Sequence, residues 1–189
     1  AGPCPILVTD VGQNQLLSAR YFRYSAPRSI ITSGGLGTMG FGLPAAIGAK
    51  MGAPQRTVCL FCGDGGIQMT IQELGTIMQY GTAVKIIILN NNFLGNVRQW
   101  QDLFFDKRFS QTPMLNPDFV AIAHAYNIKA ENVECRRDAN AAIRRMMEHD
   151  GPYLLNVNIR EEDMVMPMTP AGDNVDHIML NPGEWYTNE

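Results

Sequence analysis

Two short polar stretches, each directly after an apolar run, hold the residues best suited to chemistry. Asp64 lies in a Gly-Asp-Gly-Gly turn after the apolar residues 57–62, and Asn91 follows the apolar residues 84–89 and Asn90. A carboxylate and an amide oxygen are hard ligands for Mg²⁺ or Ca²⁺, and Mg²⁺ takes its remaining ligands from phosphates and water. The glycines beside Asp64 leave backbone N–H groups free to point at a diphosphate. The pattern predicts a metal–diphosphate site, and the alternative is a plain strand-end turn.

For this site to form, the two apolar runs must be strands that end at the same edge of a sheet. Short apolar runs bounded by Gly and Asn are typical of buried parallel strands. The segment between them predicts a helix that starts with a capping box, Thr70 to Glu73, and ends at Gly81. A right-handed β-α-β crossover then brings Asp64 and Asn91 to one edge. Four apolar residues share one face of the expected helix: Ile71, Leu74, Ile77 and Met78.

The remaining pattern predicts a doubly wound α/β fold, with a mostly parallel sheet of about six strands and helices on both faces. Further strands are expected at residues 6–10, at 29–33, near Ile128, and at 153–159 as the last strand. We expect residues 1–160 to form this domain and residues 161–189 to form a C-terminal arm without regular periodicity.

Turn and capping residues mark the expected helices. Helices are expected at residues 13–21, 41–51 and 95–103. Asn116, Pro117 and Asp118 predict an N-cap with Pro at the first helical position, followed by a buried face. Asp138 predicts the cap of the next helix. The expected buried faces are Phe119, Ile122, Ala123 and Tyr126 in the first of these two helices, and Ile143, Met146 and Met147 in the second.

Composition excludes several classes of protein. The chain has 189 residues, of which 46% are hydrophobic and 17% charged, which fits one globular domain with a real core. A formal charge of −3 argues against a nucleic-acid partner, which would need a basic stripe. The sequence shows no signal peptide and no apolar run near the length of a membrane span, so we expect a soluble, cytoplasmic protein with no membrane partner.

The cysteines suggest structure rather than redox chemistry. Four cysteines do not make a disulfide framework in a chain of this size. Cys59 and Cys62 form a C-x-x-C, but they lie inside an apolar strand, where positions i and i+3 point to opposite faces. We interpret both as buried structural thiols.

A second glycine-rich stretch leaves an alternative function open. Gly35, Gly37 and Gly40 fit the G-x-G-x-x-G fingerprint of Rossmann-type dinucleotide-binding modules. Against this interpretation, Asp64 lies in a Gly-rich turn of its own, and Asn91 is left without a role.

Gly63-Asp64-Gly65 followed by Asn90-Asn91 closely resembles the Mg²⁺–thiamine diphosphate motif of thiamine diphosphate-dependent decarboxylases and synthases. The resemblance implies a thiamine diphosphate-binding fold, with Mg²⁺ held by Asp64, Asn91 and the carbonyl of Phe93. The cofactor-binding residues that it implies are Gln13, Asn14, Gly37, Met39, Gly63, Asp64, Gly65, Gly66, Asn91, Phe93, Leu94 and Gly95.

Residues 31–48 and 94–101 extend the resemblance to the large catalytic subunit of the acetolactate (acetohydroxyacid) synthase family, over residues from about 6 to 178. It implies that pyruvate is decarboxylated on the cofactor and joined to a second 2-oxo acid, such as 2-oxobutyrate, in branched-chain amino acid biosynthesis. The alternative is another thiamine diphosphate-dependent 2-oxo acid decarboxylase or carboligase.

Three catalytic roles come with this resemblance. Gly37 would give its carbonyl to the 4′-amino group of the cofactor, Met39 would hold the cofactor in its bent form, and Trp100 would line the substrate site. The chain also departs from the family pattern: Asn14 stands where histidine is usual, Gly66 replaces a common serine, and Asn96 replaces a common methionine.

The resemblance also implies partners outside these residues. Upstream domains of the same polypeptide would supply the glutamate that protonates the cofactor's pyrimidine, and the full-length protein would be a homodimer or tetramer with a possible regulatory small subunit. FAD would lie near Gly34 and Gly35, and residues 161–189 would be part of an active-site lid. These 189 residues alone are therefore expected to be inactive.

Overall fold

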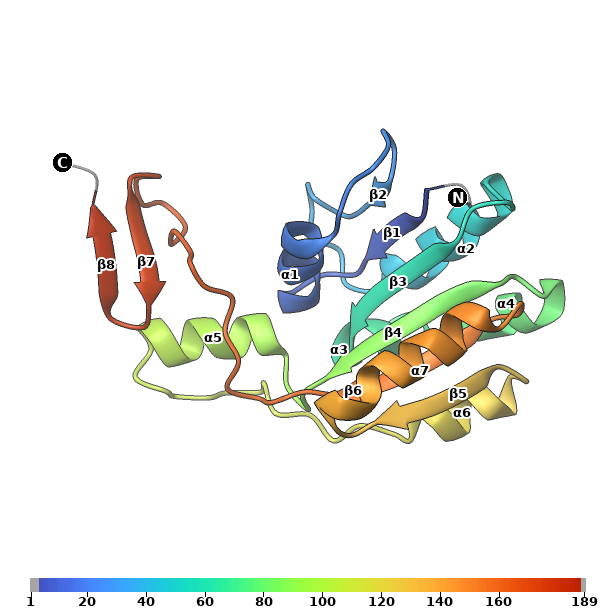
Figure 1. Cartoon of the computed structure of the whole chain (residues 1–189). Coiled ribbons are helices and arrows are strands. Elements are labelled where there is room, and N and C mark those ends of the chain that lie inside the picture. Colours follow the sequence, from blue (N-terminus) through green and yellow to red (C-terminus); the bar gives the residue numbers. More distant parts are fainter. Residues whose placement is uncertain (1–3, 188–189) are drawn as a thin grey trace.

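In the computed structural model of the chain, which describes residues 4–187, a six-stranded, all-parallel sheet is the centre of the fold (Figure 1). Residues 1–3 of the expected domain and 188–189 of the expected arm lie outside the described residues. The strand order is β2-β1-β3-β4-β6-β5, which confirms the predicted α/β fold class. The strands are β1 (Ile6–Thr9), β2 (Ile30–Ile31), β3 (Val58–Gly63), β4 (Val84–Asn90), β5 (Lys129–Val133) and β6 (Tyr153–Asn158).

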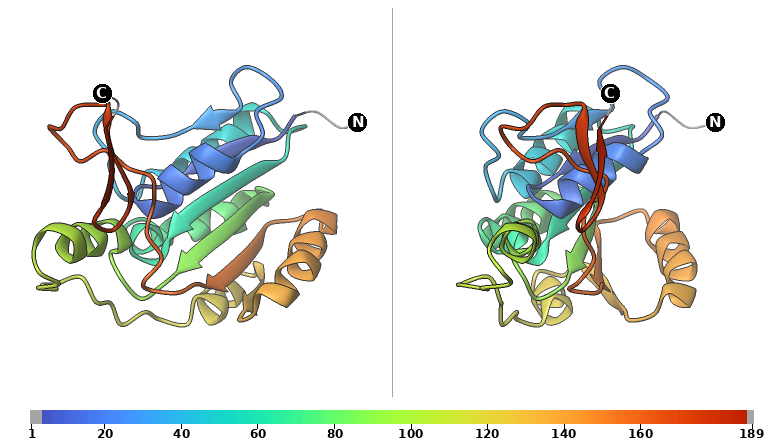
Figure 2. Two further views of the ribbon diagram at one scale, coloured as in Figure 1. Left: turned by 60° about the vertical axis from the view of Figure 1, so that its left-hand side comes forward. Right: turned by 90° about the vertical axis from the view of Figure 1, so that its left-hand side faces the viewer.

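Helices cover both faces of this sheet (Figure 2). One face carries α1 (Gln13–Tyr21) and α7 (Arg136–Glu148); the other carries α2 (Gly42–Gly52), α4 (Leu74–Tyr80) and α6 (Phe119–Ala125). Three further elements follow strand ends or lead into a helix: α3 (Asp64–Gln68), η1 (Ile71–Glu73) and α5 (Gly95–Phe104). No helix in residues 4–187 is long and apolar enough to cross a membrane.

The central strand β4 is buried on both faces, which explains its unbroken apolar sequence. Ile86 and Ile88 belong to the larger core, which contains residues of α2, α4 and α6. Ile87 points the other way, into the smaller core with Leu155 and with Met146 of α7. Alternate residues of one strand therefore hold the two helical layers on the same sheet.

The order of the strands creates a switch point between β1 and β3. The chain goes from β1 outward to β2 and then returns to β3 on the other side of β1. The loops that follow β1 and β3 consequently leave in opposite directions and open a crevice at their carboxyl ends. Ligands of open α/β sheets bind in such crevices, so the fold itself indicates where the site should lie.

The segment after β3 differs from the expected single helix. The predicted capping box is wrong, because the Thr70 hydroxyl donates to the carbonyl of Gly40 at 2.9 Å and the Glu73 carboxylate accepts from the Thr76 hydroxyl at 2.8 Å. Met78 is 46% exposed rather than buried. The predicted end at Gly81 is confirmed, with φ at 61°, a left-handed conformation that glycine adopts without strain.

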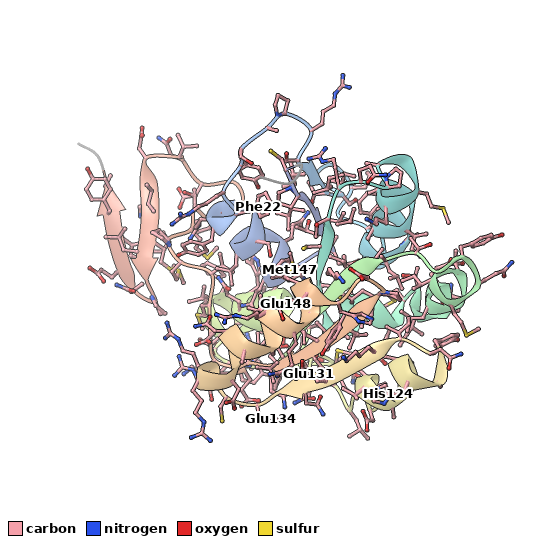
Figure 3. The ribbon with its side chains drawn as sticks, turned by 45° about the vertical axis from the view of Figure 1, so that its right-hand side comes forward. Phe22, His124, Glu131, Glu134, Met147 and Glu148 are labelled. Atoms are coloured by element: carbon pink, nitrogen blue, oxygen red, sulfur yellow. The ribbon has the colours of Figure 1, made fainter. Side chains whose placement is uncertain are left out.

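Two other predicted caps are also corrected. Asp118 alone caps α6, accepting hydrogen bonds from Val120 and Ala121, so Pro117 precedes the helix. Cys135 occupies the N-cap of α7, and Asp138 lies in the first turn. Of the three residues expected on the buried face of α7, Met146 is buried, whereas Ile143 and Met147 are each 46% exposed. Met147 is labelled in Figure 3.

The C-terminal part holds more structure than expected. β6 is not the last strand, because β7 (His177–Asn181) and β8 (Glu184–Thr187) form an antiparallel hairpin. The hairpin stands apart from the sheet, on the side where α5 lies (Figure 1). The boundary at residue 160 stays a prediction.

Of the two thiols of β3 that were predicted to be buried, Cys62 is buried and Cys59 is half-buried. Cys59 belongs to the periphery of the smaller core and Cys62 is buried in the larger one, and both are free. Burial raises the pKa of Cys59 to about 11 and the pKa of Cys62 well above its ordinary value, so neither thiol is a ready nucleophile.

An ionic cluster ties α7 to the edge of the sheet, and it predicts a pH-dependent stability. Arg145 of α7 donates to both carboxylate oxygens of Glu131 on β5, at 3.1 and 2.6 Å, and the Tyr153 hydroxyl donates to Glu131 at 2.7 Å. The hydrogen bonds from Arg145 hold the pKa of Glu131 below its ordinary value. Such a group stabilises the fold above its unfolded-state pKa, and the contribution is lost as pH falls through the folded-state pKa.

We therefore expect Glu131→Gln to lower the free energy of unfolding at pH 7, with the difference from wild type shrinking in acid. Urea unfolding from pH 7 to pH 3 measures it. Glu148→Gln is the matched control, since Glu148 is exposed at the end of α7, the helix that carries Arg145 (both glutamates are labelled in Figure 3). A difference that stays constant with pH would show that Glu131 acts through packing instead of charge.

Candidate functional site

A cleft of about 290 Å³ opens where the loops after β1, β3 and β4 meet. It lies at the carboxyl ends of these strands, where the switch point between β1 and β3 indicated a site. Eleven of the thirteen predicted site residues line it: Gln13, Asn14, Met39, Gly63, Asp64, Gly65, Gly66, Asn91, Phe93, Leu94 and Gly95. Residues far apart in sequence thus converge on one cavity because the parallel sheet brings their strand ends together.

The other two predicted residues lie beside the cleft. Gly37 has φ at 62°, and a Cβ added there would lie 3.9 Å from the side chain of Val11, which lines the cleft. Trp100 is half-buried on α5 and packs against Phe104, with 5.0 Å between the ring centroids. The substrate contact predicted for Trp100 therefore stays a prediction.

The Asp64 carboxylate is the chemical centre of the cleft. It is 2% exposed, with one oxygen accepting from the N–H of Gly65 at 3.0 Å and the other from the amide of Asn116 at 2.7 Å. Burial raises the pKa of Asp64 above its ordinary value, and these hydrogen bonds partly offset the rise. Within residues 4–187, Asp64 has no ion pair. A buried carboxylate without a counter-charge is unfavourable, so the site favours the binding of a cation.

The loop after β4 presents its backbone to the same cleft. The Asn91 side-chain oxygen accepts from the N–H of Phe93 at 3.2 Å, and Asn92 adopts a left-handed conformation with φ at 57°. Asparagine tolerates this conformation better than most residues. The tight turn directs the chain from β4 into α5 so that Phe93 and Leu94 both line the cleft.

The N-terminus of α5 opens into the cleft as well. Gly95, Asn96 and Val97 form its first turn and line the cavity, and no side chain caps this end. The first N–H groups of a helix have no partner within the helix, and the helix dipole favours negative charge there. The cleft thus combines a carboxylate that favours a cation with a helix end that favours an anion, which suits a metal–phosphate pair.

The glycines of the cleft are required by close approach. A Cβ on Gly65 would lie 2.7 Å from the Leu94 side chain, and a Cβ on Gly95 would lie 2.3 Å from the Gln13 side chain. Side chains therefore cannot be added at these positions without displacing the walls.

Asp10 is a site residue that the sequence analysis missed. Its carboxylate is 1% exposed and accepts hydrogen bonds from the N–H groups of Val11 (2.8 Å), Gly40 (3.1 Å) and Gly42 (2.7 Å). A Cβ on Gly66 would lie 2.4 Å from this carboxylate, so the serine that is common in the resembled family does not fit here. The sequence contained a signal for Asp10, and it is the same signal that revealed Asp64: an acidic residue directly after an apolar strand.

The turn after β1 is held differently from expectation. Both hydrogens of the Gln13 amide are used, by Gln99 and by the carbonyl of Asp163, each at 3.0 Å. Asn14 is 5% exposed and its side-chain nitrogen donates to the carbonyl of Val11 at 2.9 Å, whereas its buried side-chain oxygen has no hydrogen-bond partner among residues 4–187.

Comparison with known proteins agrees with this geometry. The family model described as "Thiamine pyrophosphate enzyme, C-terminal TPP binding domain" matches residues 10–157; thiamine pyrophosphate, or TPP, is thiamine diphosphate. The match contains the loops after β1, β3 and β4. It supports the thiamine diphosphate motif and not the dinucleotide-binding alternative.

Relatives with the name acetolactate synthase match most of the chain, which confirms the resemblance. The isozyme 2 large subunit of Escherichia coli (strain K12) is 46% identical over 88% of this chain and 31% of its own length. The large subunit of Lactococcus lactis subsp. lactis is 45% identical over 97% of this chain and 32% of its own. The mitochondrial acetolactate synthase of Schizosaccharomyces pombe is 44% identical over 93% of this chain and 26% of its own.

The chain therefore spans about a third of the length of the first two of these relatives. The family match covers most of the described residues and includes the loops after β1, β3 and β4, which build most of the cleft. The chain belongs to the family of thiamine pyrophosphate enzymes, as their C-terminal TPP-binding domain.

Proposed function

We propose that this chain is the Mg²⁺- and diphosphate-binding part of an acetolactate synthase, which joins pyruvate to a second 2-oxo acid such as 2-oxobutyrate. The observation that carries the proposal is the buried Asp64 carboxylate, which lies without a counter-charge in a glycine-lined cleft. The relatives named acetolactate synthase, at 46% and 45% identity, support the choice of reaction.

The residues of the cleft fit a magnesium ion. Asp64, Asn91 and the carbonyl of Phe93 would hold it, and all three residues line the cavity. Within residues 4–187, no three or more His, Cys, Asp or Glu side chains are grouped so that they could hold a metal ion, and Asp64 is the one carboxylate among the proposed ligands. That composition suits Mg²⁺, which uses one or two carboxylates and completes its shell with phosphate and water.

Backbone groups would hold the cofactor diphosphate. Two backbone segments surround the space next to Asp64. One is the turn with Gly63, Gly65 and Gly66, and the other is the start of α5 at Gly95, with Leu94 before it. When bound, thiamine diphosphate supplies the electron sink for decarboxylation of a 2-oxo acid. The protein's part is to orient the cofactor and to neutralise its negative charge.

Asn14 would contribute through water. Its side-chain oxygen is a hydrogen-bond acceptor. The oxygens of a diphosphate are acceptors too, so the two groups cannot bond to each other directly. A water molecule between them satisfies both. A histidine at this position could also carry charge; Asn14 cannot, and with one of its two amide hydrogens bound to the Val11 carbonyl it has a single N–H left to donate.

Met39 and Gly37 would orient the organic part of the cofactor. The Met39 methyl lies 3.5 Å from the point where a Cβ on Gly65 would stand, so its thioether covers the diphosphate turn. This places a flexible apolar side chain where the bent cofactor would need support. Asp10 fixes the loop that carries both residues through its bond to Gly40.

The C-terminal segment has contacts that support a lid. Gln99 accepts from the N–H of Val165 at 2.9 Å, and Arg20 donates to the carbonyl of Met166 at 2.7 Å. Asp163 lines the cleft itself. Residues 161–189 would therefore form the arm that closes the site.

Partners beyond this chain belong to the same proposal. Because relatives are named large subunits, we propose a small regulatory subunit, upstream domains of the same polypeptide, and a homodimer or tetramer. FAD near Gly34 and Gly35 and a cytoplasmic location stay predictions.

Asp64→Ala should abolish the stabilisation of the chain by Mg²⁺ plus thiamine diphosphate. It should not lower the melting temperature of the metal-free chain, because it removes a buried charge that lacks a counter-ion. A ligand at one hundred times its Kd stabilises by about 2.7 kcal/mol, which a thermal-shift assay detects easily. NAD in place of the cofactor is the control. A variant stabilised as much as wild type would disprove the metal site, and an unfolded variant would make Asp64 a turn residue.

Trp100→Leu in the full-length enzyme should change the ratio of products formed from pyruvate and 2-oxobutyrate. One pocket contact is worth about 1–3 kcal/mol of discrimination between substrates. Competition kinetics with both substrates measure the ratio. An unchanged ratio with a lower melting temperature would leave Trp100 as the packing partner of Phe104.

The 189-residue chain alone should not consume pyruvate, even with Mg²⁺ and thiamine diphosphate. The cleft would provide the diphosphate half of a cofactor site, and no glutamate among residues 4–187 lines it. A pyruvate-consumption assay on the isolated chain is the measurement. Turnover of roughly 1 per second or faster would mean that the chain holds a complete site.

A further inference from the structure

One side-chain amide joins the two loops that carry the proposed metal ligands. The Asn116 nitrogen lies 2.7 Å from Oδ2 of Asp64, which follows β3. It also lies 3.0 Å from Oδ1 of Asn90, the last residue of β4, and 3.1 Å from Oδ1 of Asn92 in the loop that follows. The two hydrogens of this amide are thus shared among three acceptors from both sides of the site.

The orientation of this amide is fixed by Gln68. The Gln68 nitrogen donates to the Asn116 oxygen at 3.0 Å and to the backbone carbonyl of Asp64 at 3.0 Å. With its oxygen facing a donor and its nitrogen facing three acceptors, the Asn116 amide has one consistent orientation. Its oxygen therefore does not point toward the metal ligands, and Asn116 is not itself a ligand.

The backbone around Asn116 is also held in place. Met114 donates its N–H to the carbonyl of Asn92 at 2.8 Å, and Leu94 donates to the carbonyl of Thr112 at 2.9 Å. On the other side, Asp118 caps α6. The amide is therefore presented by a segment that is fixed before and after it.

A chain of amides supports Asn116 from the sheet. Asn90 donates to Asn156 of β6 at 3.2 Å, and Asn156 donates to Asn132 of β5 at 2.8 Å. Asn90 and Asn156 are 7% and 8% exposed. Connected hydrogen bonds in a buried setting polarise and rigidify one another. The network extends from β5 to the Asp64 carboxylate.

We propose that Asn116 is a positioning residue that holds Asp64 and the loop after β4 at the separation that a divalent cation requires. The inference rests on the proposed metal site at Asp64. Carboxylates that bind metals are themselves hydrogen-bonded by a surrounding shell, and loss of such a partner typically costs 10- to 100-fold in metal affinity. Asn116 provides that partner for Asp64 and, through the same group, for Asn90 and Asn92.

The test measures metal affinity in the full-length protein. Mn²⁺ replaces Mg²⁺, since both prefer carboxylate and carbonyl oxygens, and free Mn²⁺ is followed by electron paramagnetic resonance with thiamine diphosphate present. Asn116→Ala should weaken Mn²⁺ binding roughly 10- to 100-fold. Circular dichroism at the same temperature confirms that the protein is folded, so that a change in Kd is not a change in stability.

Asn158→Ala is the matched control. Asn158 ends β6 at the same edge of the sheet and bonds to Glu134, away from Asp64, so its removal should leave the Kd unchanged. Gln68→Ala keeps Asn116 but frees its orientation, and should weaken binding in the same direction by a smaller factor. If Asn116→Ala does not fold, the Mn²⁺ affinity of Gln68→Ala tests the positioning role of Asn116 in its place.

The outcomes separate this inference from the function on which it rests. If wild type does not bind Mn²⁺ with the cofactor, the proposed metal site is wrong. If wild type binds and Asn116→Ala, or Gln68→Ala in its place, binds equally well, the site stands and the positioning role of Asn116 is wrong. Weakening in the Asn158→Ala control to the same degree would also overturn it, because the effect would then be general to this edge.

Discussion

The burial of the Asp64 carboxylate, which has no ion pair within residues 4–187, is the constraint on which the proposed metal site depends. Asp64 is kept from water by the walls of the cleft, and burial raises its pKa although two donors bind it directly. Neither donor carries a positive charge. An apolar residue at this position would remove that unfavourable burial. The chain keeps a residue that makes the empty site less stable and a cation-bound site more stable, as expected for function rather than folding.

The glycines around the cleft are a consequence of how the loops are held. Asp10 must approach Gly40 and Gly42 closely to accept their N–H groups, and its carboxylate then fills the space beside Gly66. A side chain at Gly66 is excluded by the same group that fixes the loop of Met39. The difference from the serine of the resembled family is thus explained by packing against Asp10.

The strands and the meeting of Asp64 with Asn91 could be predicted from sequence because they depend on local pattern. Apolar runs reveal buried strands, and parallel topology then brings their ends together. Asn116 could not be found this way, since it lies 52 residues from Asp64 in a loop of ordinary turn residues. The capping box failed for a related reason: Thr70 bonds to Gly40, a partner distant in sequence. Long-range contacts override local capping signals.

The loops after β1 and β4 also determine which groups of the cleft are free to bind a diphosphate. The family resemblance implied that Gln13 and Asn14 face a diphosphate, but both hydrogens of the Gln13 amide and one of the two of Asn14 are already bonded to protein oxygens. Besides the second N–H of Asn14, the groups left to meet negative charge would be the backbone N–H groups at the start of α5 and a cation held by Asp64. Backbone groups at a helix end are fixed by the fold, so they need no ordering of side chains when the ligand binds. Recognition of the diphosphate would then depend on the strand-end turns themselves, which explains why glycine and not a polar side chain occupies so much of the cleft.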